Sequence, residues 1–188
     1  MPIVGRSLGD AARTFCDHMN RVLALTLGTG RLVLSIEPGD TAALISFRAS
    51  GKPCGVSIQT RCGPIELFLL QRCDSRTVSG GHQLRTSEYT YTLTPQDFTE
   101  PLFRWEYVRT RQPTSARWSR HHLQGPVELS LPGLTTLNAI HLPTGYVPFE
   151  DVIRFCIHDL GAAPSDPAWH DVLEESYNRF TSEFAPSR

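Results

Sequence analysis

The spacing of apolar residues changes twice along this chain of 188 residues, and these changes limit the fold more than any other feature. Apolar residues recur every three to four positions near the start, alternate with polar residues from about residue 31, and return to helical spacing after about residue 148. Helical spacing places apolar side chains on one face of a helix, whereas alternation places them on one face of a strand. The order predicts an α+β fold, in which an antiparallel β-meander of about seven strands packs with one N-terminal and two C-terminal helices.

The first helix is expected over residues 8–25. Ser7 with Asp10 three residues later imitates a capping box, which is a signal for a helix N-terminus. The apolar face consists of Leu8, Ala12, Phe15, Met19, Val22 and Leu23. Gly28 and Gly30 then end the helix.

Short turns divide the central region into segments with strand character. These segments are residues 32–36, 43–48, 56–59, 65–71, 84–93, 102–111 and 121–129. The turns around Pro38 and Gly51 are too short for the crossover that parallel strands need, so neighbouring strands are expected to be antiparallel. The unbroken apolar run at 65–71 predicts a strand buried on both faces, and the polar stretch at 74–81 predicts a loop.

Two of these segments carry aromatic residues at the same alternating spacing. One has Tyr89, Tyr91 and Leu93 on a single face, and the next has Phe103, Trp105 and Tyr107. Cross-strand aromatic pairs stabilise antiparallel sheets, so we expect these two strands to pair through these residues.

The return to helical spacing predicts two helices after residue 148. Pro148 suits a first helical position, and Glu150 and Asp151 suit the positive end of the helix dipole in the first turn. Gly161 ends this helix, and a second begins at Asp166. We find no internal repeat or low-complexity linker, so we expect one domain over residues 1–188.

Composition excludes several classes of protein. The net charge is −1 and the pI is near 6.6, so no global basic field draws the chain to nucleic acid, and any such binding must be local.

The five cysteines show no CxxC pair, which predicts reduced thiols. Neither a secretion signal nor an apolar run of membrane-spanning length is found, so we expect a cytoplasmic protein that does not engage the membrane. No phosphate-binding or dinucleotide loop is complete, so no cofactor is predicted.

A cluster of arginines between residues 104 and 120 is the first candidate for function. The nucleic-acid-binding candidates are Arg109, Arg111, Arg117, Arg120 and Trp118. Arginine forks bind phosphates, and the interleaved aromatic residues, which also include Trp105 and Tyr107, could stack on bases. The alternative interpretation is a solvated strand face whose aromatic residues are buried in the core.

Three histidines, His121, His122 and His141, form the second candidate. Imidazole is a general base near neutral pH and a metal ligand, but no further regularly spaced carboxylate or cysteine accompanies the set, so no metal site is predicted. His122 and Gln124 are expected to project from the same face of a strand. The catalytic hypothesis is that His122 and His141 approach each other, with Glu106 orienting an imidazole and Arg104 holding an anionic group.

Four short motifs resemble a known pattern. They are Arg104-Trp105-Glu106-Tyr107, His122-Leu123-Gln124, Ile140-His141-Leu142-Pro143-Thr144-Gly145 and Glu150-Asp151-Val152-Ile153-Arg154-Phe155. In this order the motifs, within about residues 102–175, resemble a group of uncharacterised, mainly actinobacterial proteins and, more distantly, the TumE family of toxin–antitoxin systems. That pattern has a second histidine where this chain has Gln124. The resemblance implies a small bacterial accessory protein of a toxin–antitoxin or defence locus.

Two functions are therefore carried forward. The first is a binding module for single-stranded RNA or DNA, or for a protein partner encoded nearby. The second is a small hydrolase, namely a metal-independent or His-dependent ribonuclease in which His122 or His141 acts as the base and Arg104 or Arg120 stabilises the charge on phosphorus. The sequence does not say whether the protein is an enzyme.

Overall fold

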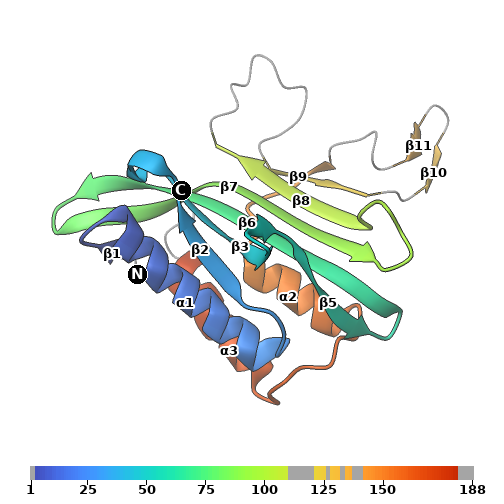
Figure 1. Ribbon diagram of the computed structural model, residues 1–188. Coiled ribbons are helices and arrows are strands. Elements are labelled where there is room, and N and C mark those ends of the chain that lie inside the picture. The colour runs from blue at the N-terminus through green and yellow to red at the C-terminus, as the bar shows by residue number, and fades with distance from the viewer. Residues whose placement is uncertain (1–2, 110–120, 126–127, 132–133, 137–141, 182–188) are drawn as a thin grey trace.

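The computed structural model describes residues 3–109, 121–125, 128–131, 134–136 and 142–181. Within these residues, a twisted antiparallel sheet is covered on one face by three helices (Figure 1). One helix lies near the N-terminus and two lie near the C-terminus. The predicted α+β fold is confirmed.

The three helices are α1 (Leu8–Thr26), α2 (Phe149–His158) and α3 (Trp169–Thr181). The predicted cap at Ser7 is confirmed, because its side chain accepts a hydrogen bond from the Asp10 amide at 3.1 Å. The Asp10 carboxylate accepts from the Arg6 amide rather than from Ser7, so the reciprocal half of a capping box is shifted by one residue. No helix in the described ranges combines the length and the apolarity needed to cross a membrane.

Ten of the described strands join one sheet, and every pairing in it is antiparallel. The main path runs β12-β9-β8-β7-β6-β3-β2. Its strands are β2 (Leu32–Ile36), β3 (Ala43–Ala49), β6 (Gly63–Val78), β7 (Gly81–Pro95), β8 (Phe103–Val108), β9 (His121–Gln124) and β12 (Leu142–Pro143). Beside this path, β1 (Val4–Gly5) pairs with β7, β4 (Lys52–Pro53) with β3, and β5 (Gly55–Thr60) with β6. A separate hairpin joins β10 (Glu128–Leu131) to β11 (Leu134–Thr136), and a short 3-10 turn, η1, spans Pro38–Asp40.

The longest feature is the hairpin of β6 and β7, and it corrects one prediction. The polar stretch at 74–81 is not a loop, because β6 continues to Val78 and pairs with β7 almost to the turn. Only Ser79 and Gly80 separate the two strands. Polar side chains are compatible with a strand here because this end of the hairpin projects beyond the helices, as Figure 1 shows.

Burial along β6 corrects a second prediction. Ile65, Leu67 and Leu69 are at most 2% exposed and face the helices, whereas Phe68 and Leu70 on the other face are only partly buried. The run is therefore not buried on both faces. The helix-covered face forms the core with the apolar sides of α1 and α2 and with Leu173 of α3.

The predicted aromatic pairing of β7 with β8 is confirmed in register. Tyr89 lies opposite Tyr107, and Tyr91 lies opposite Trp105. The rings of Tyr89 and Tyr107 are 5.6 Å apart, and all of these residues point towards the helices. The alternate residues of β8, which begin with Arg104, therefore point to the other face, which no helix of the described residues covers and which is called the helix-free face below.

Candidate functional site

The helix-free face of β6, β7, β8 and β9 carries two rows of side chains that run across the sheet. The register places one row in the order Phe68, Thr92, Arg104 and Gln124, and the next in the order Leu70, Thr90, Glu106 and His122. Directly opposed residues in an antiparallel sheet project from the same face. The four polar residues at the β8–β9 end of these rows, Arg104, Glu106, His122 and Gln124, are called the polar quartet below.

The quartet fixes the guanidinium of Arg104. Its Nε and Nη2 atoms donate to Oε1 of Gln124 at 3.0 and 2.5 Å, while its Nε lies 3.9 Å from a carboxylate oxygen of Glu106. Gln124 is 5% exposed and Arg104 is 36% exposed, so a buried amide holds a cation that reaches solvent. A guanidinium held in this way can bind a carboxylate or phosphate with little loss of side-chain entropy.

The quartet also joins a carboxylate to an imidazole. Nε2 of His122 lies 3.1 Å from Oε2 of Glu106, as the catalytic hypothesis requires for a carboxylate that orients a histidine. The His122 ring is only 3% exposed, whereas 30% of the Glu106 side chain is exposed. In the described conformation the carboxylate, not the imidazole, therefore meets solvent. His141, the second histidine of that hypothesis, lies outside the described residues.

His121 points to the opposite side of the sheet from His122. Its ring stacks on Tyr107 with centroids 4.2 Å apart, and its Nδ1 lies 3.2 Å from the hydroxyl of Tyr89. Neighbouring residues of a strand face opposite ways, so His121 and His122 cannot share a metal ion or a substrate. Within the described residues, no group of three or more histidine, cysteine or acidic side chains gathers in a metal-binding arrangement.

Base stacking by Trp105 and Tyr107 is a wrong prediction. Both residues face the helix layer, where the Trp105 ring meets Phe155 edge-on at 5.8 Å and Tyr107 packs on Tyr89. Their alternation with Arg104 and Glu106 reflects burial in the core, which is the alternative interpretation considered for this segment.

Arg109 is the one described member of the predicted nucleic-acid-binding set. Its Nη1 donates to both carboxylate oxygens of Asp74 at 3.2 and 3.1 Å, and its Nη2 donates to the carbonyl of Thr86. Asp74 also accepts from Arg85 at 2.9 Å. The charge of Arg109 is therefore balanced inside the fold. Arg111, Arg117, Arg120 and Trp118 lie outside the described residues.

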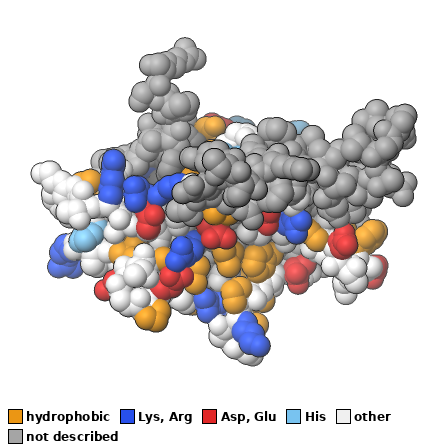
Figure 2. All heavy atoms as spheres, turned by 90° about the horizontal axis from the view of Figure 1, so that it is seen from above, with side chains coloured by type: hydrophobic (Ala, Val, Ile, Leu, Met, Phe, Trp, Pro, Cys, Tyr) orange, Lys and Arg blue, Asp and Glu red, His pale blue; other side chains and the backbone are white. Residues whose placement is uncertain are grey.

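Charge on this side of the molecule is mixed rather than uniformly basic. Figure 2 shows basic and acidic side chains interleaved over the described part of the upper surface. Arg72, for example, donates two hydrogen bonds to the carboxylate of Glu37, at 3.1 and 2.6 Å. The described part of this face therefore has no uniformly basic field that would attract anions.

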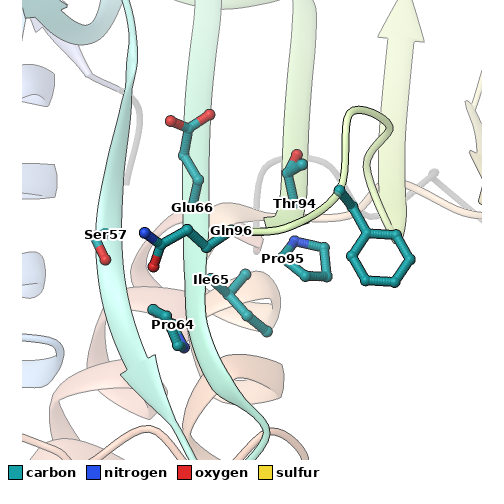
Figure 3. Close-up of a pocket in the computed structure, with 8 residues that line it drawn as sticks. Ser57, Pro64, Ile65, Glu66, Thr94, Pro95 and Gln96 are labelled. Carbon is teal, nitrogen blue, oxygen red and sulfur yellow. The ribbon is translucent and has the colours of Figure 1, made fainter.

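A hollow of about 310 Å³ lies one row beyond Phe68, where β7 leads into the loop before β8. It is lined by Ser57, Pro64, Ile65, Glu66, Thr94, Pro95, Gln96 and Phe98. In Figure 3, Glu66 and Thr94 point in the same direction, and the side chain of Gln96 extends across β6 towards Ser57 on β5. The hollow thus combines two hydroxyls, an amide and a carboxylate.

A second polar cluster lies among the helices, around Glu150. This residue is 3% exposed, and Ser176 donates a hydrogen bond to its carboxylate. Burial raises the pKa of Glu150 to about 7. The Ser176 hydroxyl also lies 2.8 Å from Nε2 of His18, whose pKa burial lowers to about 4. A buried serine that joins two groups in this way links α1, α2 and α3, and it is not presented to a substrate.

Sequence reasoning found the polar quartet and missed its surroundings. Phe68 is hidden in an unbroken apolar run, so no alternation signalled that it faces away from the core. Glu66 and Gln96 are separated by a whole hairpin and meet only through the β6–β7 register. Comparison of the chain with protein-family models, curated proteins and solved structures gave no match. The site is therefore interpreted from its own geometry.

Proposed function

We propose that this protein is a binding module for single-stranded nucleic acid, and that the ligand lies across the helix-free face of β6, β7 and β8. The observation that carries this proposal is the guanidinium of Arg104, which Gln124 holds in place and which reaches solvent in the same row as Phe68. Arg104 supplies a contact to phosphate, and Phe68 supplies an aromatic surface. Single-stranded nucleic acids are commonly bound by this combination.

The spacing of the row supports this ligand class. Thr92 separates Phe68 from Arg104, so the two side chains start about 10 Å apart, which is twice the spacing of neighbouring strands. The hydroxyl of Thr92 between them can donate to a sugar or phosphate oxygen. A sheet face that alternates an aromatic ring, a hydroxyl and a guanidinium suits a chain that alternates base, sugar and phosphate.

The sequence resemblance adds a biological setting to this proposal. It suggests an accessory protein of a toxin–antitoxin or defence locus, and single-stranded RNA is a fitting ligand for such a protein. A protein partner encoded nearby is the competing ligand, and the binding experiments below include it as an outcome.

Hydrolysis of RNA is the second candidate, and the contact between Glu106 and His122 favours it. In this mechanism His122, oriented by Glu106, removes the proton from a ribose 2′-hydroxyl, whose oxygen attacks the adjacent phosphorus and expels the 5′-oxygen. Arg104 would balance the negative charge on the phosphate oxygens. Because the His122 ring is 3% exposed, the described conformation gives it no access to a ribose, so binding is the better-supported function.

Titration of fluorescently labelled nine-residue RNA, monitored by anisotropy at low and at physiological salt, tests binding directly. The proposal expects saturable binding of single strands that weakens as salt rises, and weaker binding of a duplex of the same length. Electrophoresis of the same RNA after incubation tests the second candidate, since cleavage that disappears in His122→Ala would establish hydrolysis.

A further inference from the structure

The hollow beside the proposed nucleic-acid surface has the features of a site that recognises a base. Three residues on its rim come from different strands or loops, namely Ser57 on β5, Glu66 on β6 and Gln96 after β7. They are neighbours because β5, β6 and β7 are adjacent strands, with Ser57 opposite Glu66 and Glu66 opposite Thr94. The volume of about 310 Å³ is at the lower end of the range for small-molecule sites.

The glycine at position 55 makes room for the side chain of Glu66. A Cβ atom at Gly55 would lie 2.1 Å from Cγ of Glu66, which is closer than two carbon atoms that are not bonded can approach. The Glu66 chain therefore lies over the bare backbone of β5, in the space that a larger residue would fill. The absence of a side chain at Gly55 thus allows this position of Glu66.

Glu66 and Phe98 present a polar and an apolar group of the hollow to solvent. Among the described residues, the Glu66 carboxylate forms no hydrogen bond or ion pair. Phe98 is 61% exposed, which makes it the most exposed large apolar side chain in the described ranges. A carboxylate accepts hydrogen bonds at both oxygens, and an exposed ring offers a stacking surface.

We infer that this hollow binds a guanine base of the nucleic acid that the proposed function assigns to the neighbouring surface. Guanine is the common base with two adjacent hydrogen-bond donors on its Watson–Crick edge, the ring N1–H and the exocyclic amino group. Both can donate to the two oxygens of Glu66, while the Gln96 amide can donate to the guanine O6 atom. Adenine, cytosine and uracil cannot donate twice to one carboxylate in this way.

The position of the hollow relative to Arg104 fits one nucleotide. From Glu66, Arg104 lies two strands across and two residues along the sheet, or about 10 and 7 Å. That separation is comparable with the length of a nucleotide from its base edge to its phosphate. This inference rests on the proposed function, because Arg104 holds the phosphate of the nucleotide whose base Glu66 would recognise.

Replacing the central base of a nine-residue oligouridine tests the inference. Guanine, hypoxanthine and adenine are compared at that position, since hypoxanthine lacks only the exocyclic amino group of guanine. The full-length protein should bind the guanine oligonucleotide about tenfold more tightly than the adenine one, with hypoxanthine between them. In Glu66→Gln the guanine-to-adenine ratio should fall to about one, because the amide has a single acceptor atom.

Two further variants distinguish a loss of the guanine site from a general effect of substitution on the protein. Gly55→Ala retains Glu66 but displaces its side chain, so the guanine preference should again be lost. Glu88→Gln removes an equal charge from the same face of the sheet, but on β7 and outside the hollow. This variant should retain the preference for guanine. If the oligonucleotides bind with equal affinity, the guanine site is wrong and the binding surface stands. If no oligonucleotide binds at low salt, the proposed function fails, and Glu66-dependent binding of an arginine-rich peptide would then assign the hollow to a protein partner.

Discussion

The side-chain oxygen of Gln124 accepts two hydrogen bonds from the guanidinium of Arg104, at 3.0 and 2.5 Å. Gln124 is 5% exposed and holds no charge, so it positions the arginine without neutralising it. A substitution of Gln124 can therefore change the placement of the positive charge while the charge itself remains.

Replacing Gln124 by Leu should therefore weaken nucleic-acid binding without removing a charge. We expect affinity for single-stranded RNA to fall by about three- to tenfold, because a guanidinium that has lost its hydrogen bonds to Gln124 must be ordered when the ligand binds. The slope of log affinity against log salt should stay that of the unmodified protein, since the number of phosphate contacts is unchanged. Anisotropy titrations at four salt concentrations measure both quantities. A reduced slope would show that Gln124 does more than position Arg104.

The buried carboxyl of Glu150 should make stability depend on pH. Its pKa of about 7 in the folded protein exceeds its ordinary value of 4.5, so between these values the folded state binds a proton that the unfolded chain does not. The contribution of Glu150 to stability is therefore complete below about pH 4.5 and is lost as pH rises to about 7. Glu150→Gln should be more stable than the parent at pH 8, by up to about 3 kcal/mol, and similar at pH 4. Urea unfolding at both pH values measures the difference, and equal stability at pH 8 would contradict it.

His18 should act in the opposite direction. Burial lowers its pKa from 6.5 to about 4, with further lowering from Arg179 and Arg21, so the folded state resists protonation of this ring. Stability from this group rises between about pH 4 and 6.5, the same window in which the Glu150 contribution falls. The unmodified protein should thus show a nearly flat profile there, whereas His18→Gln should lose stability steadily as pH rises. Melting temperatures measured from pH 4.5 to 6.5 distinguish the two shapes.

The ion pair between Asp74 and Arg109 should contribute to stability more than to nucleic-acid binding. Asp74 accepts hydrogen bonds from both Arg85 and Arg109, and about a third of its side chain is exposed. We expect Arg109→Ala to cost about 1 kcal/mol of stability and to change RNA affinity little, because its charge is already balanced. A double-mutant cycle with Asp74→Ala, followed by urea unfolding, measures the coupling. A large loss of affinity with unchanged stability would return Arg109 to the nucleic-acid surface.

The elements of the fold follow from local patterns, and the errors arise where tertiary context overrides them. The alternation of Tyr89 and Tyr91 with polar residues predicts a strand, because burial of one sheet face leaves a period of two. The same spacing of aromatic residues at Trp105 and Tyr107 predicts the partner strand. The stretch after Asp74 was predicted as a loop because its residues are polar, yet strand pairing with β7 satisfies their backbone groups beyond the core. The position of Glu150 in the first turn of α2 follows from the sequence, whereas its burial depends on Ser176, which comes from a different helix.

The candidate site likewise contains residues that the sequence groups together and residues that it does not. Arg104, Glu106 and His122 could be grouped from sequence because strand alternation places them on one face. The contribution of Glu66 could not, since it depends on the β6–β7 register and on the absence of a side chain at Gly55. Neither property leaves a local pattern.

Salt-dependent binding of single-stranded RNA by Arg104→Ala tests the central claim most directly. Arg21→Ala on the exposed side of α1 is the matched control, because it removes the same charge away from the sheet. The proposed function predicts that Arg104→Ala lowers affinity at least about tenfold at low salt and reduces the salt slope by about one, while Arg21→Ala changes neither. Equal effects of the two substitutions, or an unmodified protein whose binding does not depend on salt, would contradict a phosphate contact at Arg104.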